Sequence, residues 1–158
     1  MHYVVEVTTV LSGFLVPILA GFGVYIAWRQ YAVARDKLRL DWYDKRFAVY
    51  QSLNELFQRI YTDSTITIEE LKKFKGGTSQ STFLFDESSG MDKFLEEVYK
   101  KAVRLYAIGR KITNTNLPVG EERNELAEEE SKILEWFNVQ TDEAKKLFGK
   151  YLKPSDKS

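Results

Sequence analysis

The sequence predicts an all-α protein in which one N-terminal transmembrane helix continues into a cytoplasmic antiparallel helical bundle. Three observations carry this prediction. Residues 7–28 contain no Lys, Arg, Asp, Glu or His, although the mean hydropathy of the chain is −0.35. No Gly or Pro occurs in residues 24–75. Apolar residues downstream recur at helical spacings of three and four.

The 22 residues 7–28 are long enough for one membrane crossing. At the helical rise they reach about 33 Å, against a hydrocarbon core of about 30 Å. A buried helix of this length without a charge is unusual, and the chain is small to surround one. A cleaved signal is the other alternative, because residues 32–34 read Ala-Val-Ala, but Met1–Glu6 lacks the basic residues of a signal. We therefore divide the chain into an extracytoplasmic N-terminus (1–6), a transmembrane helix (7–28) and a cytoplasmic α-helical domain (29–158).

The charges that flank this segment predict its orientation. Only Glu6 precedes it, whereas six basic residues follow within 18 positions: Arg29, Arg35, Lys37, Arg39, Lys45 and Arg46. The positive-inside rule then places the C-terminus in the cytoplasm and the N-terminus outside, with the lipid bilayer as a partner. Tyr3 at one end, and Tyr25, Trp28 and Tyr31 at the other, are typical interfacial residues.

Small residues within the same segment predict helix packing and a homo-oligomer. Gly23 and Ala27 form a small-xxx-small pair, which lets helix backbones approach closely. Pro17 removes a backbone donor and favours a kink. The candidate helix-packing or pore residues are Ser12, Gly13, Pro17, Ala20, Gly23 and Ala27. Whether the segment lines a pore or only anchors the chain stays open.

The bundle is expected to begin with a continuation of the first helix. Its apolar residues from Tyr43 to Ile60 lie at spacings of three and four, and the helix is expected to end near Tyr61. Thr67 and Glu70 then form a capping box that opens a short helix closed by Gly76 and Gly77.

Residues 76–90 read as a Gly- and Ser-rich loop in which Phe83, Leu84 and Phe85 form a plug against the core. Ser88 or Ser89 is expected to cap a helix over residues 91–112. Two further helices are expected, over 121–138 and from Thr141 to Leu152. Short connections between such helices predict antiparallel packing.

Charge is segregated although 23 basic and 23 acidic residues cancel. Residues 100–111 carry five basic residues and no acidic one, whereas the helix from Glu121 is acidic. These two faces can neutralise each other. Alternatively, a basic cluster binds lipid headgroups or the phosphates of a nucleotide or oligonucleotide. The candidate ligand-binding residues are Arg35, Arg39, Lys45, Arg46, Lys100, Lys101 and Arg104.

Catalytic chemistry is absent from the sequence pattern. The chain has no cysteine and one histidine, His2, which excludes disulfides and thiolate metal sites. No phosphate-binding loop, GxSxG or HExxH motif is present. We therefore expect no catalytic residues, no metal, no cofactor and no enzymatic activity.

Three segments carry a resemblance to small bacterial single-span inner-membrane proteins. They are RDKLRLDWYDKRFAVY at Arg35–Tyr50, FLFDE at Phe83–Glu87 before the helix MDKFLEEVYKKAVRLY, and FGKYL at Phe148–Leu152. This layout is similar to that of membrane effectors of anti-phage defence operons, of the Hailong type. The resemblance implies an oligomeric, channel-like or membrane-disrupting effector. It also implies control by a nucleotide or single-stranded oligonucleotide that a partner nucleotidyltransferase makes. The alternative is a membrane-tethered helical scaffold that recruits a cytoplasmic partner.

Overall fold

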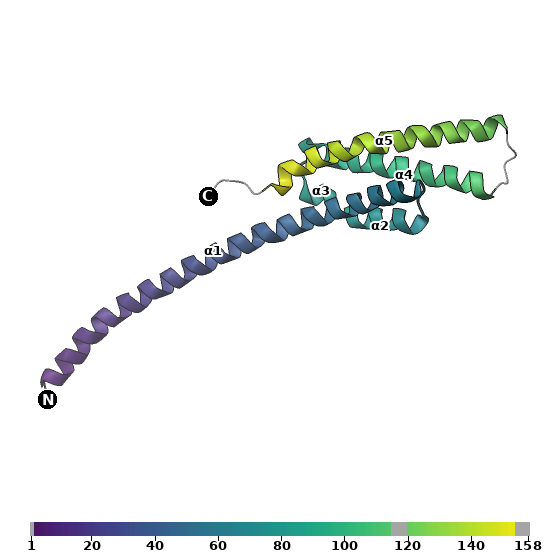
Figure 1. The fold of residues 1–158 in the computed structure, drawn as a ribbon. Helices are drawn as coiled ribbons and strands as arrows, with labels where there is room; N and C mark the ends of the chain where they lie inside the picture. Colours follow the sequence, from purple (N-terminus) through teal and green to yellow (C-terminus); the bar gives the residue numbers. More distant parts are fainter. Residues whose placement is uncertain (1, 115–119, 154–158) are drawn as a thin grey trace. The chain divides into compact units, whose positions relative to one another are not determined.

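The computed structural model describes the backbone of residues 2–114 and 120–153, and the side chains of residues 17–113 and 120–153. Every regular element in this part of the chain is helical, which confirms the all-α prediction. The helices are α1 (His2–Asp63), α2 (Ile68–Thr78), α3 (Ser81–Leu84), the 3-10 helix η1 (Glu87–Ser89), α4 (Met91–Asn114) and α5 (Glu121–Leu152) (Figure 1).

The chain divides into two compact units, Met1–Asp41 and Trp42–Ser158. The first unit consists of the N-terminal two-thirds of α1. The second unit, called the bundle below, contains the remainder of α1 and all the other helices.

The predicted transmembrane helix over residues 7–28 is wrong on the residues that the structure describes. None of the helices there is both long enough and apolar enough to cross a membrane. The physical reason is that the described part of this segment, residues 17–28, is followed directly by Arg29 and Gln30, so the apolar series among the described side chains is too short for a crossing. Residues 7–16 of the predicted segment lie outside the described side chains. The predicted single-pass inner-membrane localisation, with the N-terminus outside, depended on this transmembrane helix and is corrected for the same reason.

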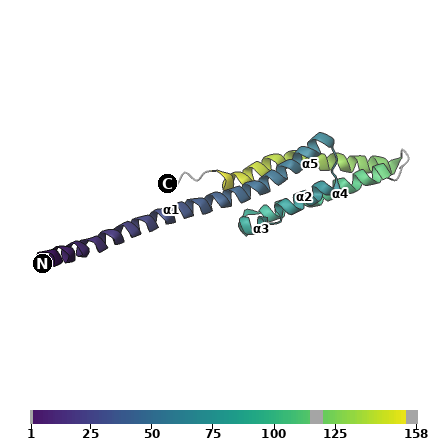
Figure 2. The same ribbon diagram turned by 90° about the horizontal axis from the view of Figure 1, so that it is seen from below.

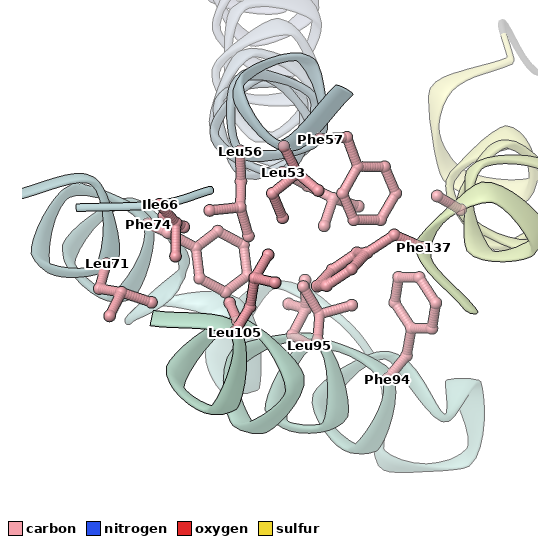
Figure 3. Packing of buried hydrophobic residues seen from close by; sticks show 14 of the residues in the cluster. Leu53, Leu56, Phe57, Ile66, Leu71, Phe74, Phe94, Leu95, Leu105 and Phe137 are labelled. Atoms are coloured by element: carbon pink, nitrogen blue, oxygen red, sulfur yellow. The ribbon is translucent and has the colours of Figure 1, made fainter. Parts of the chain in front are cut away.

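The bundle is built around one apolar core. In both views α4 and α5 lie side by side and run in opposite directions (Figures 1 and 2). Figure 3 shows Leu53 and Phe57 of α1 meeting Leu95 and Leu105 of α4, with Phe137 of α5 between them. All five side chains are at most 4% exposed. Burial of each such side chain contributes about 1.5–3 kcal/mol, so the core accounts for the packing of the helices.

The start of α2 follows from a local sequence motif. The Thr67 hydroxyl accepts a hydrogen bond from the Glu70 backbone N–H at 3.3 Å, and the Thr67 N–H donates to Glu70 Oε2 at 2.8 Å. This reciprocal pair is the predicted capping box, and it satisfies two backbone donors that the first helical turn leaves free.

The predicted end of α2 is wrong, because the helix continues through Gly76 and Gly77 to Thr78. Neither glycine has the left-handed conformation that terminates helices. Gly77 has a tertiary role instead. A Cβ at Gly77 would lie 2.1 Å from Ser52 Oγ and 2.8 Å from Ser52 Cβ, so the missing side chain lets α2 approach α1.

These two glycines give opposite predictions for alanine substitution. Gly77→Ala is expected to lower the free energy of unfolding by about 1–3 kcal/mol, because the new methyl group forces α1 and α2 apart. Gly76→Ala is expected to raise it by about 0.5–1 kcal/mol, because a Cβ there meets nothing within 4 Å and alanine favours the helix. Urea unfolding followed by circular dichroism measures both. Changes of the same sign in the two variants would contradict the close approach at Ser52.

Residues 76–90 were predicted to form a loop, but they contain the short helices α3 and η1. The predicted packing of Phe83, Leu84 and Phe85 against the core is confirmed for two of these three residues. Leu84 and Phe85 are 6% and 5% exposed, whereas Phe83 is 81% exposed. Ser89 Oγ accepts a hydrogen bond from the Met91 N–H at 3.1 Å, so Ser89 satisfies the first backbone donor of α4 from two positions before it.

The prediction of two helices between residues 121 and 152 is also wrong, because α5 runs without a break from Glu121 to Leu152. Thr141 does not cap a new helix. Its hydroxyl donates to the Phe137 carbonyl one turn earlier, at 3.5 Å, and shares a hydrogen bond with the Tyr61 hydroxyl of α1. The threonine therefore joins α5 to α1, and the helix continues through it.

Candidate interaction surfaces

Residues 18–40 of α1, called the apolar segment below, expose many large apolar side chains. Exposure runs from 51% at Ile26 to 71% at Val24, and it includes aromatic rings such as Phe22, Trp28 and Tyr31. Isolated apolar residues are common on protein surfaces, but a contiguous series of this length marks an interaction site.

The predicted helix-packing residues lie partly in this segment. Ala20, Gly23 and Ala27 are exposed on α1, and a Cβ at Gly23 would meet nothing within 4 Å. Pro17 lies inside α1, which continues on both sides of it. Ser12 and Gly13 lie outside the residues with described side chains.

Three exposed residues of the apolar segment were not among the predicted site residues. Val33, Leu38 and Leu40 are 66%, 59% and 59% exposed, and they lie among charged residues beyond the predicted transmembrane helix. The signal that could have found them is spacing. Leu38 lies seven residues after Tyr31, and Leu40 lies seven after Val33, which is the repeat of packed helices.

The four predicted ligand-binding residues on α1 differ in their exposure to solvent. Arg35, Arg39 and Lys45 are exposed, and Arg35 lies 3.7 Å from the carboxylate of Asp36. Arg46 is instead half-buried in the bundle. Arg46 is therefore considered separately from the other three.

Arg46 joins three parts of the bundle. Its Nε donates a hydrogen bond to the Leu84 carbonyl at 2.9 Å. Its guanidinium carbon lies 5.7 Å from the ring centre of Trp42, 5.9 Å from that of Phe85 and 5.2 Å from that of Tyr151. Contacts of this length with aromatic rings are cation–π interactions. Arg46 therefore holds the segment after α3 and the end of α5 against α1, and its Nε–H is already engaged.

The second group of predicted ligand-binding residues contacts acidic and aromatic side chains. Arg104 of α4 binds Glu129 of α5 through two hydrogen bonds of 2.6 Å. Lys101 lies 5.8 Å from the ring centre of Trp136 on α5, and Lys100 lies 3.7 Å from a carboxylate oxygen of Glu96. The two hydrogen bonds from Arg104 hold the pKa of the Glu129 carboxyl below its usual value. The Arg104–Glu129 pair is a neutralisation between the basic and acidic faces, as the sequence allowed.

A cavity of about 350 Å³, which no sequence pattern predicted, lies between α1 and α2. Arg59 binds Glu70 across it, and Lys73 lies 2.9 Å from Glu55. Burial raises the pKa of Glu70, but hydrogen bonds from Arg59 and Thr67 outweigh it and leave the pKa below its usual value. The acidic and basic groups of this cavity thus neutralise each other. The lining residues are Ser52, Asn54, Glu55, Leu56, Gln58, Arg59, Thr62, Glu70, Lys73 and Phe74.

Among the residues whose side chains are described, no group of three or more His, Asp or Glu residues is placed to hold a metal ion.

Comparison of the chain with models of protein families, with curated proteins and with solved structures gives no significant match. These comparisons therefore add no support to the resemblance to Hailong-type effectors.

Proposed function

We propose that the chain is a non-enzymatic interaction protein that assembles into homo-oligomers through the apolar segment and presents its bundle in several copies. One observation carries this proposal. The bundle buries most of its large apolar residues in its own core, whereas every large apolar side chain from Ile18 to Leu40 is more than half exposed. An apolar helix surface of this extent gains free energy when another helix covers it.

The charges of the apolar segment favour a second copy as the partner. Arg35, Lys37 and Arg39 alternate with Asp36 and Asp41 over seven residues. A partner of one sign would be repelled by part of this series. A second copy carries both signs at the same levels, so that basic and acidic groups of neighbouring helices can pair.

Control by a nucleotide or oligonucleotide, and an effector role in anti-phage defence, stay predictions from the resemblance. A phosphate ligand at Lys100, Lys101 and Arg104 would have to displace Glu96, Trp136 and Glu129 from their present contacts. This cost favours assembly and display of the bundle over ligand control as the proposed function.

Six substitutions in the apolar segment test the proposal: Val24→Gln, Ile26→Gln, Tyr31→Gln, Val33→Gln, Leu38→Gln and Leu40→Gln. Glutamine keeps helix propensity but removes apolar area. Light scattering of the purified full-length chain should give a multiple of 18.4 kDa for the unsubstituted protein and a single copy for the variant.

The control for this experiment carries the same chemical change on the bundle. Phe83→Gln and Val139→Gln alter side chains that are 81% and 62% exposed, and they should leave the mass unchanged. The urea midpoint of the bundle should be the same in all three proteins. A single-copy mass for the unsubstituted chain at every concentration, or an unchanged mass for the six-fold variant, would refute the proposal.

A further inference from the structure

The large apolar residues of the apolar segment are not distributed evenly around α1. At 3.6 residues per turn, a shift of two residues turns a helix by about 200°. Val24, Tyr31 and Leu38 repeat every seven residues, and Ile26, Val33 and Leu40 repeat every seven residues two positions later. They therefore form two stripes on nearly opposite sides of the helix. The first stripe is Val24, Trp28, Tyr31 and Leu38, and the second stripe is Phe22, Ile26, Val33 and Leu40.

The two sides between the stripes carry mainly small or charged residues. One side contains Gly23, Ala27, Ala34 and Asp41, and the other contains Gly21, Ala32 and Arg39, with Tyr25 at the border of the second stripe. A single neighbouring helix is enough to cover one apolar stripe. A helix with two opposite stripes needs a neighbour on each side.

Charges within the stripes favour contact between unlike stripes. Arg35 falls within the first stripe, between Tyr31 and Leu38, whereas Asp36 borders the second stripe, between Val33 and Leu40. Two first stripes packed in parallel would bring Arg35 against Arg35. A first stripe packed against a second stripe brings Arg35 against Asp36 of the neighbouring copy.

A second basic residue gives the same result. Arg29 lies in the second stripe, between Ile26 and Val33, at the level of Trp28 and Tyr31. Contact between unlike stripes places the Arg29 guanidinium against these two rings, which attract cations. Contact between two second stripes would instead oppose Arg29 to Arg29.

We infer that parallel copies of the chain pack the first stripe of one α1 against the second stripe of the next. Such a contact is heterologous, so the copy at each end of the assembly has one uncovered stripe. Further copies therefore add until the assembly closes into a ring, or it extends as a filament. This inference rests on the proposed function, because it specifies how the apolar segment assembles.

Single cysteines test the inference, since the chain has none of its own. Leu38→Cys marks the first stripe and Leu40→Cys marks the second. Oxidation of the double variant should give a ladder of dimers, trimers and larger species on a non-reducing gel. Each single variant should give at least about tenfold less dimer, because a disulfide requires Cα atoms within about 7 Å. A mixture of the two single variants should give dimers without trimers.

The matched control is Ala32→Cys with Ala34→Cys, which has the same two-residue offset on the sides between the stripes and should give little product. Dimers from either single variant as abundant as those from the double variant would show contact between like stripes and overturn the inference. An oligomeric mass by light scattering with no ladder from the double variant would overturn it too, while leaving the proposed function intact. A single-copy mass for the unsubstituted chain would remove both.

Discussion

Replacing Phe137 by alanine is expected to lower the free energy of unfolding of the bundle by about 3–5 kcal/mol, the largest effect of any substitution considered. The Phe137 side chain is 0% exposed, and its ring centre lies 5.7 Å from that of Phe57 on α1 and 5.2 Å from that of Trp136. Truncation removes buried apolar area and leaves a cavity where α1, α4 and α5 meet (Figure 3). The backbone carbonyl that accepts from the Tyr61 hydroxyl at 2.9 Å is retained, so the loss reports on packing.

Urea unfolding followed by tryptophan fluorescence and by circular dichroism measures this change. Phe83→Ala is the matched control, because it removes the same atoms from a side chain that is 81% exposed, and it should change the free energy of unfolding by less than about 0.5 kcal/mol. Similar losses in the two variants would contradict the described core.

Replacing Arg46 by methionine is expected to lower the free energy of unfolding by about 2–4 kcal/mol. Methionine keeps the apolar stem but cannot donate to the Leu84 carbonyl, so that partly buried acceptor loses its partner. It also loses the attraction between the guanidinium and the rings of Trp42, Phe85 and Tyr151.

Lys45→Met separates this structural role from the predicted ligand-binding role. Lys45 is exposed beside Arg46, and both were predicted as members of one basic cluster. If Arg46 holds the bundle together, Arg46→Met lowers the urea midpoint and Lys45→Met leaves it within error. Equal midpoints for the two variants would argue that Arg46 is as dispensable to the fold as its neighbour.

Features that depend on residues close together in the chain could be predicted before the fold was known. The capping box of Thr67 and Glu70, the hydrogen bond at Ser89 and the buried apolar face of α1 from Leu53 to Ile60 occur as expected. Tyr43 and Phe47, at the start of the predicted face, are exposed instead. These features involve hydrogen bonds or faces within about two helical turns, so the partners are contained in the local pattern.

Features that depend on distant partners could not be predicted, because they follow from how the helices pack. Gly77 lies inside α2 where Ser52 of α1 leaves no room for a side chain, and Thr141 lies inside α5 with its hydroxyl bound to that of Tyr61. Arg46 has the same sequence character as Lys45, yet the rings of Phe85 and Tyr151 surround it. In each case the deciding contact joins residues 25 or more positions apart, so the local pattern does not contain it. Tertiary packing also determines which apolar residues are covered. A residue's hydrophobicity shows that burial is favourable, but it does not show which other surface covers that residue.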